Sequence, residues 1–359
     1  MVCDRAAQAR RGGDPATNLL TTKDFVYRFN AADVKGIVCT ALGDVTRFVD
    51  EAQPKSPSLQ VKLVAHGGCD APGWQNFDEL VEQASDEFAR VDTKATDPML
   101  LYFTSGTTGY PKMVVHDYTY SLAHIPTAKH WHNIPAGGLH LTISDTGWGK
   151  AAWGKLYGQW AIGATVFVYD FDKFIPHDML TIIQKYRIST FCAPPTMYRF
   201  FIKEGIENYD LSSLQYATIA GEALNPEVYN RFYEYTGLKL MEGFGQTETT
   251  LLIANLPGMT KPGSMGKPTP YNVDLVDEDG NSVANGRLVK LWFAWKRAKS
   301  STVCFGLPRR EDQGGWHDGL YHTGDTAWRD EDGYLVCGRT DDVIKASGYR
   351  IGPFEIESV

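Results

Sequence analysis

The chain has 359 residues, of which 43% are hydrophobic and 12% aromatic, and its formal net charge is −8. This composition is typical of a folded protein and excludes a largely disordered chain. The acidic balance argues against a general nucleic-acid binder, which usually presents a basic face. No apolar run approaches the roughly 18 residues of a membrane span. Six cysteines without a CxxC pair or zinc-ligand spacing fit a reducing compartment, so we expect a cytoplasmic protein.

The first predicted elements alternate between helix and strand. A polar-capped helix is predicted over residues 21–34, a β-branched strand over 36–40, an amphipathic helix over 44–52 and a second strand over 61–65. This rhythm is typical of a parallel sheet covered by helices. The same pattern returns further along the chain, at residues 164–169, 179–186, 188–193, 216–220 and 226–235.

After residue 258 the pattern changes to short strands separated by Gly, Asp-Gly and Asn-Gly turns. Such spacing favours a small β-rich subdomain. The expected fold class is therefore α/β, with two α/β lobes on mostly parallel sheets and a small β-rich subdomain. The expected segments are a partial first lobe with the phosphate loop, a second lobe, the β-rich subdomain, and a hinge with the start of a further domain, at residues 15–160, 161–257, 258–340 and 341–359.

Two tracts differ from the rest of the sequence. Residues 1–14 are rich in Arg, Ala and Gly and lack helical or strand periodicity. The second tract spans residues 284–315, and its part 284–310 has seven Lys or Arg and no acidic residue. A basic binding patch and a divergent insertion are two interpretations of the second tract. We favour a third, in which these residues are translated out of frame.

A Gly-rich loop follows an apolar strand and ends at Lys112, in the string LLYFTSGTTGYPK. Glycines let the backbone approach a phosphate, N–H groups and hydroxyls donate to its oxygens, and the lysine adds a point charge. The spacing does not match the GxxxxGK[ST] pattern of the P-loop. Taken alone, the string fits a plain turn as well as a phosphate site.

The complete string TSGTTGYPK is similar to the phosphate-loop signature of the adenylate-forming superfamily, which includes acyl-CoA synthetases, luciferases and peptide-synthetase adenylation domains. Further segments match in the family's order. AGEAL at 220–224 resembles the adenine-contacting segment, MEGFGQTET at 241–249 the adenylate-binding motif, YHTGD at 321–325 the ribose-binding motif, and GRTDDVIKASGYR at 338–350 the hinge region. The strings SGYRIGPFEIES and DTGW resemble medium-chain acyl-CoA synthetases most.

The resemblance implies ATP as the nucleotide and assigns its phosphate contacts. The β- and γ-phosphates would be held by Thr104, Ser105, Gly106, Thr107, Thr108, Gly109 and Lys112. Thr247 would donate to the α-phosphate or the substrate carboxylate, and Glu248 would ligate Mg²⁺ through a hard oxygen. Lys112, Thr247 and Glu248 are thus the expected catalytic residues.

The resemblance also implies contacts to the nucleoside and to coenzyme A. Asp325 would accept hydrogen bonds from the ribose hydroxyls, and Arg339 would neutralise phosphate or bind ribose. The remaining residues expected to contact ATP or coenzyme A are Gly221, Glu222, Ala223, Glu242, Gly243, Phe244, Gly245, Gln246, Ser347, Gly348, Tyr349 and Arg350. Each of them, taken singly, has a simpler interpretation as a turn or a solvated face, and only their shared order favours a site.

The implied reaction converts a carboxylic acid, ATP and coenzyme A into acyl-CoA, AMP and pyrophosphate through an acyl-adenylate. Family members that use acetate place a Trp where this chain has Gly245, which implies room for a medium-chain or aromatic acid. At about 0.8 kcal/mol per buried CH₂, such room would favour the longer acid. Trp148 and Phe244 are candidate pocket walls beside Gly245, although core packing explains these aromatic residues equally well.

Compared with the family it resembles, the chain is expected to be truncated at both ends. The C-terminal lid and its lysine would follow the hinge position Asp341, and part of the first lobe would precede residue 15. Three interpretations stay open: an acyl-CoA synthetase, a nucleotide-binding fragment with little turnover, and an adenylation module that loads a carrier protein. The expected partners are small molecules, with no nucleic acid and no membrane span, and the oligomeric state is open.

Overall fold

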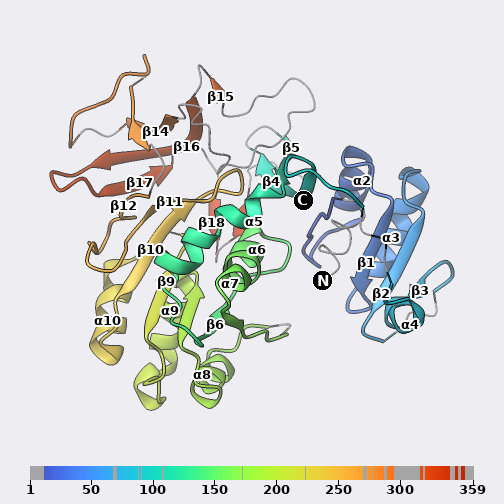
Figure 1. The fold of residues 1–359 in the computed structure, drawn as a ribbon, viewed down its shortest axis with the longest axis horizontal. Helices are drawn as coiled ribbons and strands as arrows, with labels where there is room; N and C mark the ends of the chain where they lie inside the picture. The colour runs from blue at the N-terminus through green and yellow to red at the C-terminus, as the bar shows by residue number, and fades with distance from the viewer. Residues whose placement is uncertain are drawn as a thin grey trace. The chain divides into compact units, whose positions relative to one another are not determined.

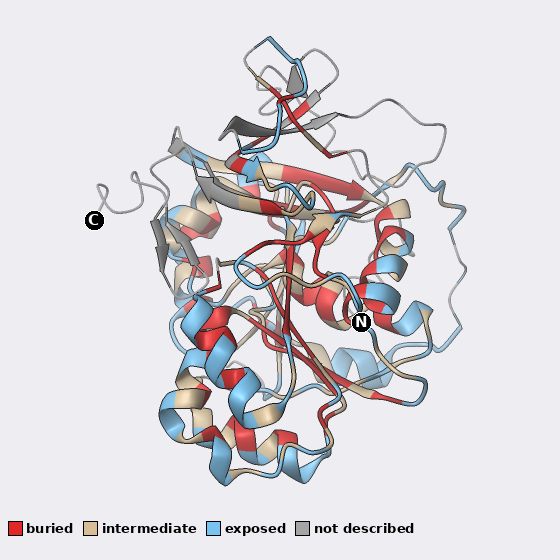
Figure 2. Ribbon diagram, turned by 90° about the vertical axis from the view of Figure 1, so that its left-hand side faces the viewer, coloured by how far each residue is buried: buried red, intermediate tan, exposed pale blue. Residues whose placement is uncertain are grey.

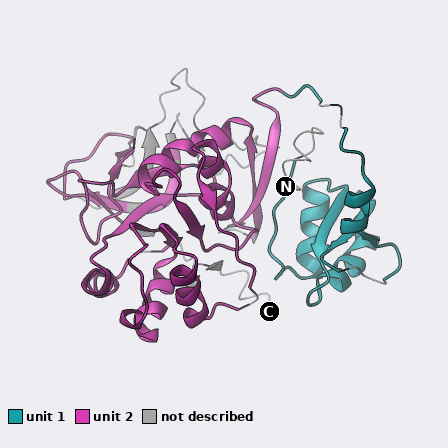
Figure 3. Ribbon diagram, turned by 60° about the horizontal axis from the view of Figure 1, so that its bottom comes forward, with its two compact units in different colours: residues 1–93 teal, residues 94–359 magenta. Residues whose placement is uncertain are grey.

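The chain divides into two compact units, residues 1–93 and residues 94–359 (Figure 3). The computed structural model describes residues 12–67, 71–87, 89, 91–106, 109–171, 173–222, 224–269, 273–277, 279–286, 289–294, 316–317, 320–339, 344–346 and 349–351. The lobe boundary expected after residue 160 stays a prediction, while the compact units divide after residue 93. Strand β6 (Leu139–Thr142), expected in the first lobe, pairs with β7 (Thr165–Val166) and β8 (Thr190–Ala193) in one sheet.

The first unit is a small parallel sheet with helices. Its strands β1 (Gly36–Thr40), β2 (Val61–Ala65) and β3 (Gln75–Asn76) pair in that order. The helical segments of this unit are α2 (Thr22–Ala31), α3 (Val45–Ala52), η1 (Gln53–Lys55) and α4 (Phe77–Gln83). Apolar residues recur at helical spacing in α2 and α3, so that Phe25, Phe29, Val45 and Val49 form one buried cluster with Val64. The predicted strands over 36–40 and 61–65 are confirmed.

A buried ion pair joins helix α3 to strand β2. Lys62, with 7% of its side chain exposed, donates to Asp50 at 2.7 Å, and the indole N–H of Trp74 donates to the same oxygen at 2.9 Å. A cation as buried as Lys62 needs this carboxylate, since an unpaired buried charge is costly.

We therefore expect Asp50→Ala to destabilise the first unit by about 2 kcal/mol, below the value for a fully buried pair because Asp50 itself is partly exposed. Hydrogen exchange of the β1 and β2 amides measures the effect for this unit alone. The matched control is Asp44→Ala at the start of the same helix, where the exposed pair with Arg47 contributes little to stability. Equal effects of the two substitutions would contradict the prediction.

The second unit is built around a mixed sheet with the strand order β12-β11-β10-β9-β8-β6-β7 (Figure 1). The five strands from β7 to β10 pair in parallel, and the two at the other edge pair antiparallel. The remaining strands of this sheet are β9 (Tyr216–Ile219), β10 (Leu240–Gly245), β11 (Leu251–Ala254) and β12 (Lys267–Pro268). Parallel strands covered on both faces are short apolar runs, and all four residues of β8 are buried.

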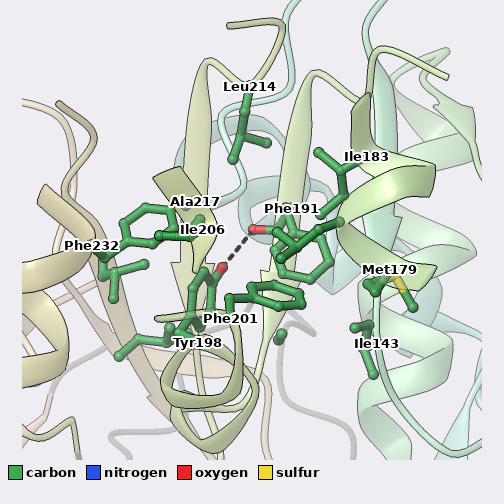
Figure 4. Packing of buried hydrophobic residues seen from close by; sticks show 14 of the residues in the cluster. Ile143, Met179, Ile183, Phe191, Tyr198, Phe201, Ile206, Leu214, Ala217 and Phe232 are labelled. Atoms are coloured by element: carbon green, nitrogen blue, oxygen red, sulfur yellow. Dashed lines mark hydrogen bonds between the residues drawn. The ribbon is translucent and has the colours of Figure 1, made fainter. Parts of the chain in front are cut away.

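Three helices lie between successive parallel strands of this sheet, namely α8 (Pro176–Lys185), α9 (Pro195–Glu204) and α10 (Pro226–Thr236), with the short η3 (Ile206–Asn208) after α9. Each of the three begins with a proline, whose fixed φ suits the first helical turn. Their apolar faces and the sheet form the largest core, in which Tyr198 donates a hydrogen bond to the carbonyl of Phe191 (Figure 4). The predicted helix over 226–235 and strand over 216–220 are thus confirmed within one residue.

The opposite face of the sheet carries a second set of helical segments: α5 (Thr119–Ala123), the π-helical η2 (Thr127–Trp131), α6 (Gly149–Lys155) and α7 (Tyr157–Ala161). Because side chains alternate along a strand, Phe191 and Ala193 of β8 belong to the first core, whereas Cys192 packs with Trp131 and Trp153. Figure 2 shows buried residues along the strands and exposed residues on the outer sides of the helices.

Two β structures complete the second unit. Strands β4 (Pro98–Gly106) and β5 (Gly109–Asp117) form a long antiparallel hairpin around the Gly-rich loop. The expected β-rich region contains a second, antiparallel sheet and a terminal hairpin, made of β13 (Asp274–Leu275), β14 (Val289–Ala294), β15 (Trp316–His317), β16 (Leu320–Arg329), β17 (Leu335–Arg339), β18 (Ile344–Ala346) and β19 (Tyr349–Ile351). Strand β12 lies within the residues expected to form the β-rich subdomain, but it pairs with β11 of the large mixed sheet.

The two unusual tracts are covered only in part. Residues 1–11 and 295–315 lie outside the described residues, while residues 289–294 of the second tract form strand β14 between β13 and β16. In the part of the chain that the structure describes, no helix has the length and apolar character needed to cross a bilayer.

Candidate functional site

The carboxyl ends of four neighbouring parallel strands place four sequence segments at one edge of the large sheet. Strand β6 leads into the DTGW segment, β8 into the turn at Pro194, β9 into AGEAL and β10 into the GQTET segment. Ligands of open α/β sheets bind outside the carboxyl ends of the strands. The topology therefore gathers segments that are up to 100 residues apart into one candidate site, which lies entirely within the second unit.

The AGEAL segment is held from two sides. Thr196, at the start of α9, donates to Glu222 Oε2 at 2.6 Å, and Lys150 of α6 donates to the carbonyl of Ala220 at 3.1 Å. Burial lowers the pKa of Lys150, and the nearby Cys192 and Glu222 oppose that shift. The other carboxylate oxygen of Glu222 is buried and has no partner among the described residues. Glu222 is thus placed at the sheet edge, while Ala223 lies outside the described residues.

The hairpin of β4 and β5 fixes the two ends of the phosphate loop. Thr104 on β4 lies opposite Lys112 on β5 in the antiparallel register, which keeps both next to the turn. Of the loop between them, Thr107 and Thr108 lie outside the described residues, and the structure gives only the backbone of Ser105, Gly106 and Gly109, in the two strands.

A buried histidine connects this hairpin to the adenylate-binding motif. The Nε2 atom of His116, on β5, lies 2.7 Å from the carbonyl oxygen of Thr247. The ring is fully buried and stacks on Tyr120 at a centroid distance of 4.0 Å. Burial lowers the pKa of His116 to about 4, so the imidazole is neutral at physiological pH. The residue expected to touch the reacting groups, Thr247, is therefore anchored to the strand that continues from Lys112.

Gln246, which precedes Thr247 in the adenylate-binding motif, connects this motif to the ribose-binding segment. The side-chain amide of Gln246 donates to the Thr323 carbonyl at 2.7 Å and to the Asp325 carboxylate at 2.8 Å, and its oxygen accepts from the Tyr321 hydroxyl at 2.8 Å. Asp325 is buried, with 1% exposed. It lies opposite Arg339 in the pairing of β16 with β17. Hydrogen bonds at residues 246 and 247 therefore join the phosphate-loop hairpin, the adenylate-binding motif and the ribose-binding segment.

The glycines of the adenylate-binding motif are required by close approach. A Cβ at Gly243 would lie 2.6 Å from ring carbons of Trp131, and a Cβ at Gly245 would lie 2.4 Å from the Thr250 carbonyl oxygen. Gly245 is thus explained by backbone packing at an irregular point of the β10–β11 ladder, independently of any acyl chain. Phe244 packs against the core of the β-rich region. The acyl pocket at Gly245 and Phe244 stays a prediction.

Three further expected site residues lie in these segments and strands. Trp148 directly precedes α6, and a Cβ on the next residue, Gly149, would lie 3.9 Å from the Thr247 side chain. Glu242 is buried on β10. The backbone of Gly221 has a φ of 103°, a left-handed conformation that favours glycine.

The candidate magnesium ligand is a single carboxylate, that of Glu248. Glu248 follows Thr247 directly and is half-buried. Mg²⁺ is commonly bound by one or two carboxylates together with substrate phosphates, rather than by a cage of protein ligands. The described residues contain no group of three His, Cys, Asp or Glu side chains placed to hold a metal, and the role of Glu248 stays a prediction.

The remaining expected residues are only partly described. Asp341, Ser347 and Gly348 lie outside the described residues, and only the backbone of Arg339, Tyr349 and Arg350 is given, in β17 and β19. Their predicted contacts with phosphate, ribose and coenzyme A stay predictions.

The sequence profile of the AMP-binding enzyme family matches residues 15–294, more than half of the chain. The chain belongs to this family. The matched residues begin where the first unusual tract ends and stop within the second. Membership of the AMP-binding superfamily, predicted from the motif order, is thereby confirmed.

Individual relatives of this AMP-binding chain agree. It is 39% identical over 352 residues to human acyl-coenzyme A synthetase ACSM5, mitochondrial, and 39% identical over 357 residues to the mouse ACSM4 protein of the same kind. Both alignments cover 96% of this chain and 60% of the relative, so the chain spans about three fifths of their length. A Brucella canis acyl-CoA synthetase structure matches with a TM-score of 0.80, 27% identity, and coverage of 98% of this chain and 65% of that one.

A second solved structure shows the fold alone, because its sequence identity is only 24%. It is the anthranilate CoA ligase AuaEII in complex with anthranoyl-AMP, with a TM-score of 0.82 over 95% of this chain and 65% of that chain. The mixed α/β architecture of this AMP-binding chain is thus that of acyl-CoA synthetase large domains, over part of their length.

Two residues of the candidate site make hydrogen bonds that the sequence did not predict. His116 was not singled out, although its position four residues after Lys112 on a regular strand places both on one face. The expected contact of Gln246 with the nucleotide stays a prediction, and its side-chain amide is hydrogen-bonded to three residues of β16. Such long-range hydrogen bonds have no local sequence signal.

Proposed function

We propose that the protein to which this chain belongs is an acyl-CoA synthetase, which activates a carboxylic acid as an acyl-adenylate and transfers the acyl group to coenzyme A. The observation that supports the proposal most is the junction at residues 246 and 247. There the hydrogen bonds of His116 and Gln246 join the phosphate-loop hairpin, the adenylate-binding motif and the ribose-binding strand. One nucleotide lying across this junction would reach all three.

The chemistry needs positioning and charge neutralisation more than bond-breaking by the protein. The carboxylate must approach an α-phosphate that already bears negative charge, so preorganised donors and cations lower the barrier. Lys112 would neutralise the β- and γ-phosphates, and Thr247 would donate to the α-phosphate or the carboxylate. Mg²⁺ held by Glu248 would supply further positive charge to the phosphates, and Asp325 would fix the ribose through its hydroxyls.

The acid we propose is a medium-chain or aromatic carboxylic acid. The similarity to acyl-coenzyme A synthetases of the ACSM type supports an acid longer than acetate. Trp148 is a candidate wall, since it lies at the same edge of the sheet as Thr247. With about 0.8 kcal/mol per buried CH₂, four additional CH₂ groups would favour hexanoate over acetate by about 3 kcal/mol.

ATP, Mg²⁺ and coenzyme A are the proposed small-molecule partners, and the cytoplasm is the proposed compartment. The names of the two relatives place those proteins in mitochondria. Fractionation of cells that express the full-length protein tests the compartment, and recovery with mitochondrial markers would overturn it.

The proposed activity is tested by acid-dependent exchange of labelled pyrophosphate into ATP, followed by thioester formation with coenzyme A. The full-length protein is assayed with acids from acetate to dodecanoate and with benzoate. We expect exchange to require an acid and to be fastest with medium-chain or aromatic acids. Absence of exchange with every acid would overturn the proposal and favour a protein that binds a nucleotide without turnover. Exchange without thioester formation would favour an adenylation module that loads a carrier protein.

A further inference from the structure

We infer that His116 is a positioning residue for acid activation, acting by holding the peptide of Thr247 in register with Lys112. This inference rests on the proposed function, because it assigns a means of positioning within the same site. It is based on one hydrogen bond between residues 131 positions apart, on the burial of the ring and on the way the ring is held.

The direction of the hydrogen bond follows from its acceptor. A backbone carbonyl can only accept, so the Nε2 atom of His116, 2.7 Å from the Thr247 oxygen, must bear the hydrogen. The Nδ1 atom is buried and has no partner among the described residues. A neutral ring with its hydrogen on Nε2 satisfies this arrangement, and the lowered pKa of His116 is consistent with it.

The ring has little freedom to move. Tyr120 of α5 stacks on it with centroids 4.0 Å apart, and Tyr102 of β4 meets it edge-on at 5.9 Å. Its own backbone pairs with Leu100 in the hairpin. Aromatic contacts on two sides and a paired backbone therefore fix where the Nε2 hydrogen points.

The hairpin makes this anchor relevant to the phosphate site. The β5 side of the hairpin pairs without interruption from Lys112 to His116, and alternate residues of a strand face the same way. Lys112 and His116 therefore lie on one face of one strand, at the loop and at the motif respectively. Movement of the loop relative to Thr247 is restrained by a single paired segment and one hydrogen bond.

A second anchor holds the residue that precedes Thr247. Gln246 precedes Thr247 and is tied to Thr323 and Asp325 of β16. With His116 on one side and β16 on the other, the Thr247 peptide is fixed between the phosphate and ribose segments. Loss of the histidine donor would free the Thr247 peptide on the side of the phosphate loop. A misplacement of a positioning group by about 1 Å can slow a reaction about a hundredfold.

Other buried histidines of this unit make contacts of a different kind. Among the described residues, His140 is hydrogen-bonded to Thr142, Thr190 and Gly154, and His124 to Thr127. His124 is the matched control, because it lies in the same aromatic stack, against Tyr120 at 4.5 Å, without a bond to the motif.

The experiment compares His116→Met, His116→Gln and His124→Met in the full-length protein. The methionine at 116 fills the site without a donor, whereas the amide of glutamine can replace the Nε2–H. Exchange of pyrophosphate into ATP gives kcat and the KM for ATP, and thermal unfolding is recorded for each variant.

We expect His116→Met to lower kcat by about tenfold to a hundredfold, with the KM for ATP changed less than about threefold. His116→Gln should restore kcat to within about fivefold, and His124→Met should lower thermal stability while leaving kcat unchanged. Equal kcat for His116→Met and the unsubstituted protein would overturn the inference and leave the proposed function standing. Loss of kcat in His116→Gln as great as in His116→Met would also overturn it. Absence of exchange in the unsubstituted protein would instead overturn the proposed function.

Discussion

The free energy of unfolding of the second unit is expected to fall as the pH drops below about 6.5, the ordinary pKa of histidine. Among the residues of this unit whose burial the structure describes, four histidines are buried, namely His116, His124, His132 and His140. Burial lowers the pKa of His116 and His140 to about 4 and that of His124 to about 3, and it lowers the pKa of His132 well below its usual range. Neighbouring histidines and Lys150 lower the pKa of His132 further.

The direction of the effect follows from proton uptake. The unfolded chain takes up protons on these histidines near pH 6.5, whereas the folded unit takes them up only near pH 4 or below, so acid favours the unfolded state. The stabilising contribution is complete above pH 6.5 and is lost progressively as the pH falls toward 4. A shift from 6.5 to about 4 corresponds to about 3 kcal/mol, and the larger shift of His124 to about 5 kcal/mol. Together these shifts are on the order of the whole stability of an ordinary domain, about 5–15 kcal/mol.

Urea unfolding at several pH values between 7.5 and 5 measures the effect. In His124→Gln one of the four groups is removed, so the free energy of unfolding should depend less steeply on pH. Identical stabilities at pH 7.5 and pH 5, or the same pH dependence in this variant, would contradict the explanation.

Replacing Lys112 by Ala is expected to weaken ATP binding or slow pyrophosphate exchange by about tenfold to a hundredfold. A charge-assisted contact of this kind is worth about 1.5–3 kcal/mol. AMP lacks the β- and γ-phosphates, so its affinity should change much less. Titration calorimetry with ATP and with AMP separates the two cases.

The matched control is Lys203→Ala on α9, where the lysine is exposed on a helix remote in sequence from every motif. It should change neither affinity. Equal weakening of ATP and AMP binding in Lys112→Ala would show that the lysine acts on the nucleoside or on folding, and not on the terminal phosphates.

Local patterns in the sequence predicted the elements that local physics determines. The β-branched run at 36–40, the amphipathic helix before Ala52 and the proline-started helix at Pro226 were all expected within a residue or two. Amphipathic periodicity, turn residues and helix caps act over a few positions and can be read directly.

The unit boundary could not be predicted in this way. Strand β6 has the same apolar pattern whether it ends one lobe or sits inside the next, and only its parallel pairing with β8 decides. The antiparallel pairing of β5 with β4 was also not predicted from the sequence. Pairing partners are set by the tertiary fold, which short sequence windows do not report.

For the candidate site, too, some features could be predicted from the sequence and others depend on the tertiary fold. Motif order predicted that Lys112, Thr247 and Asp325 would act together, and the structure brings their segments together through hydrogen bonds. The residues that make those bonds, His116 and the amide of Gln246, were not predicted to do so, since nothing local marks a partner 79 to 131 residues away.

A crystal structure of the chain with bound ATP is the most direct test of the shared nucleotide site. It should show a single ATP molecule with its β- and γ-phosphates at Lys112, its α-phosphate near Thr247 and its ribose hydroxyls at Asp325. ATP bound elsewhere, or bound at the loop with its ribose directed away from Asp325, would contradict the convergence of the three segments on one nucleotide.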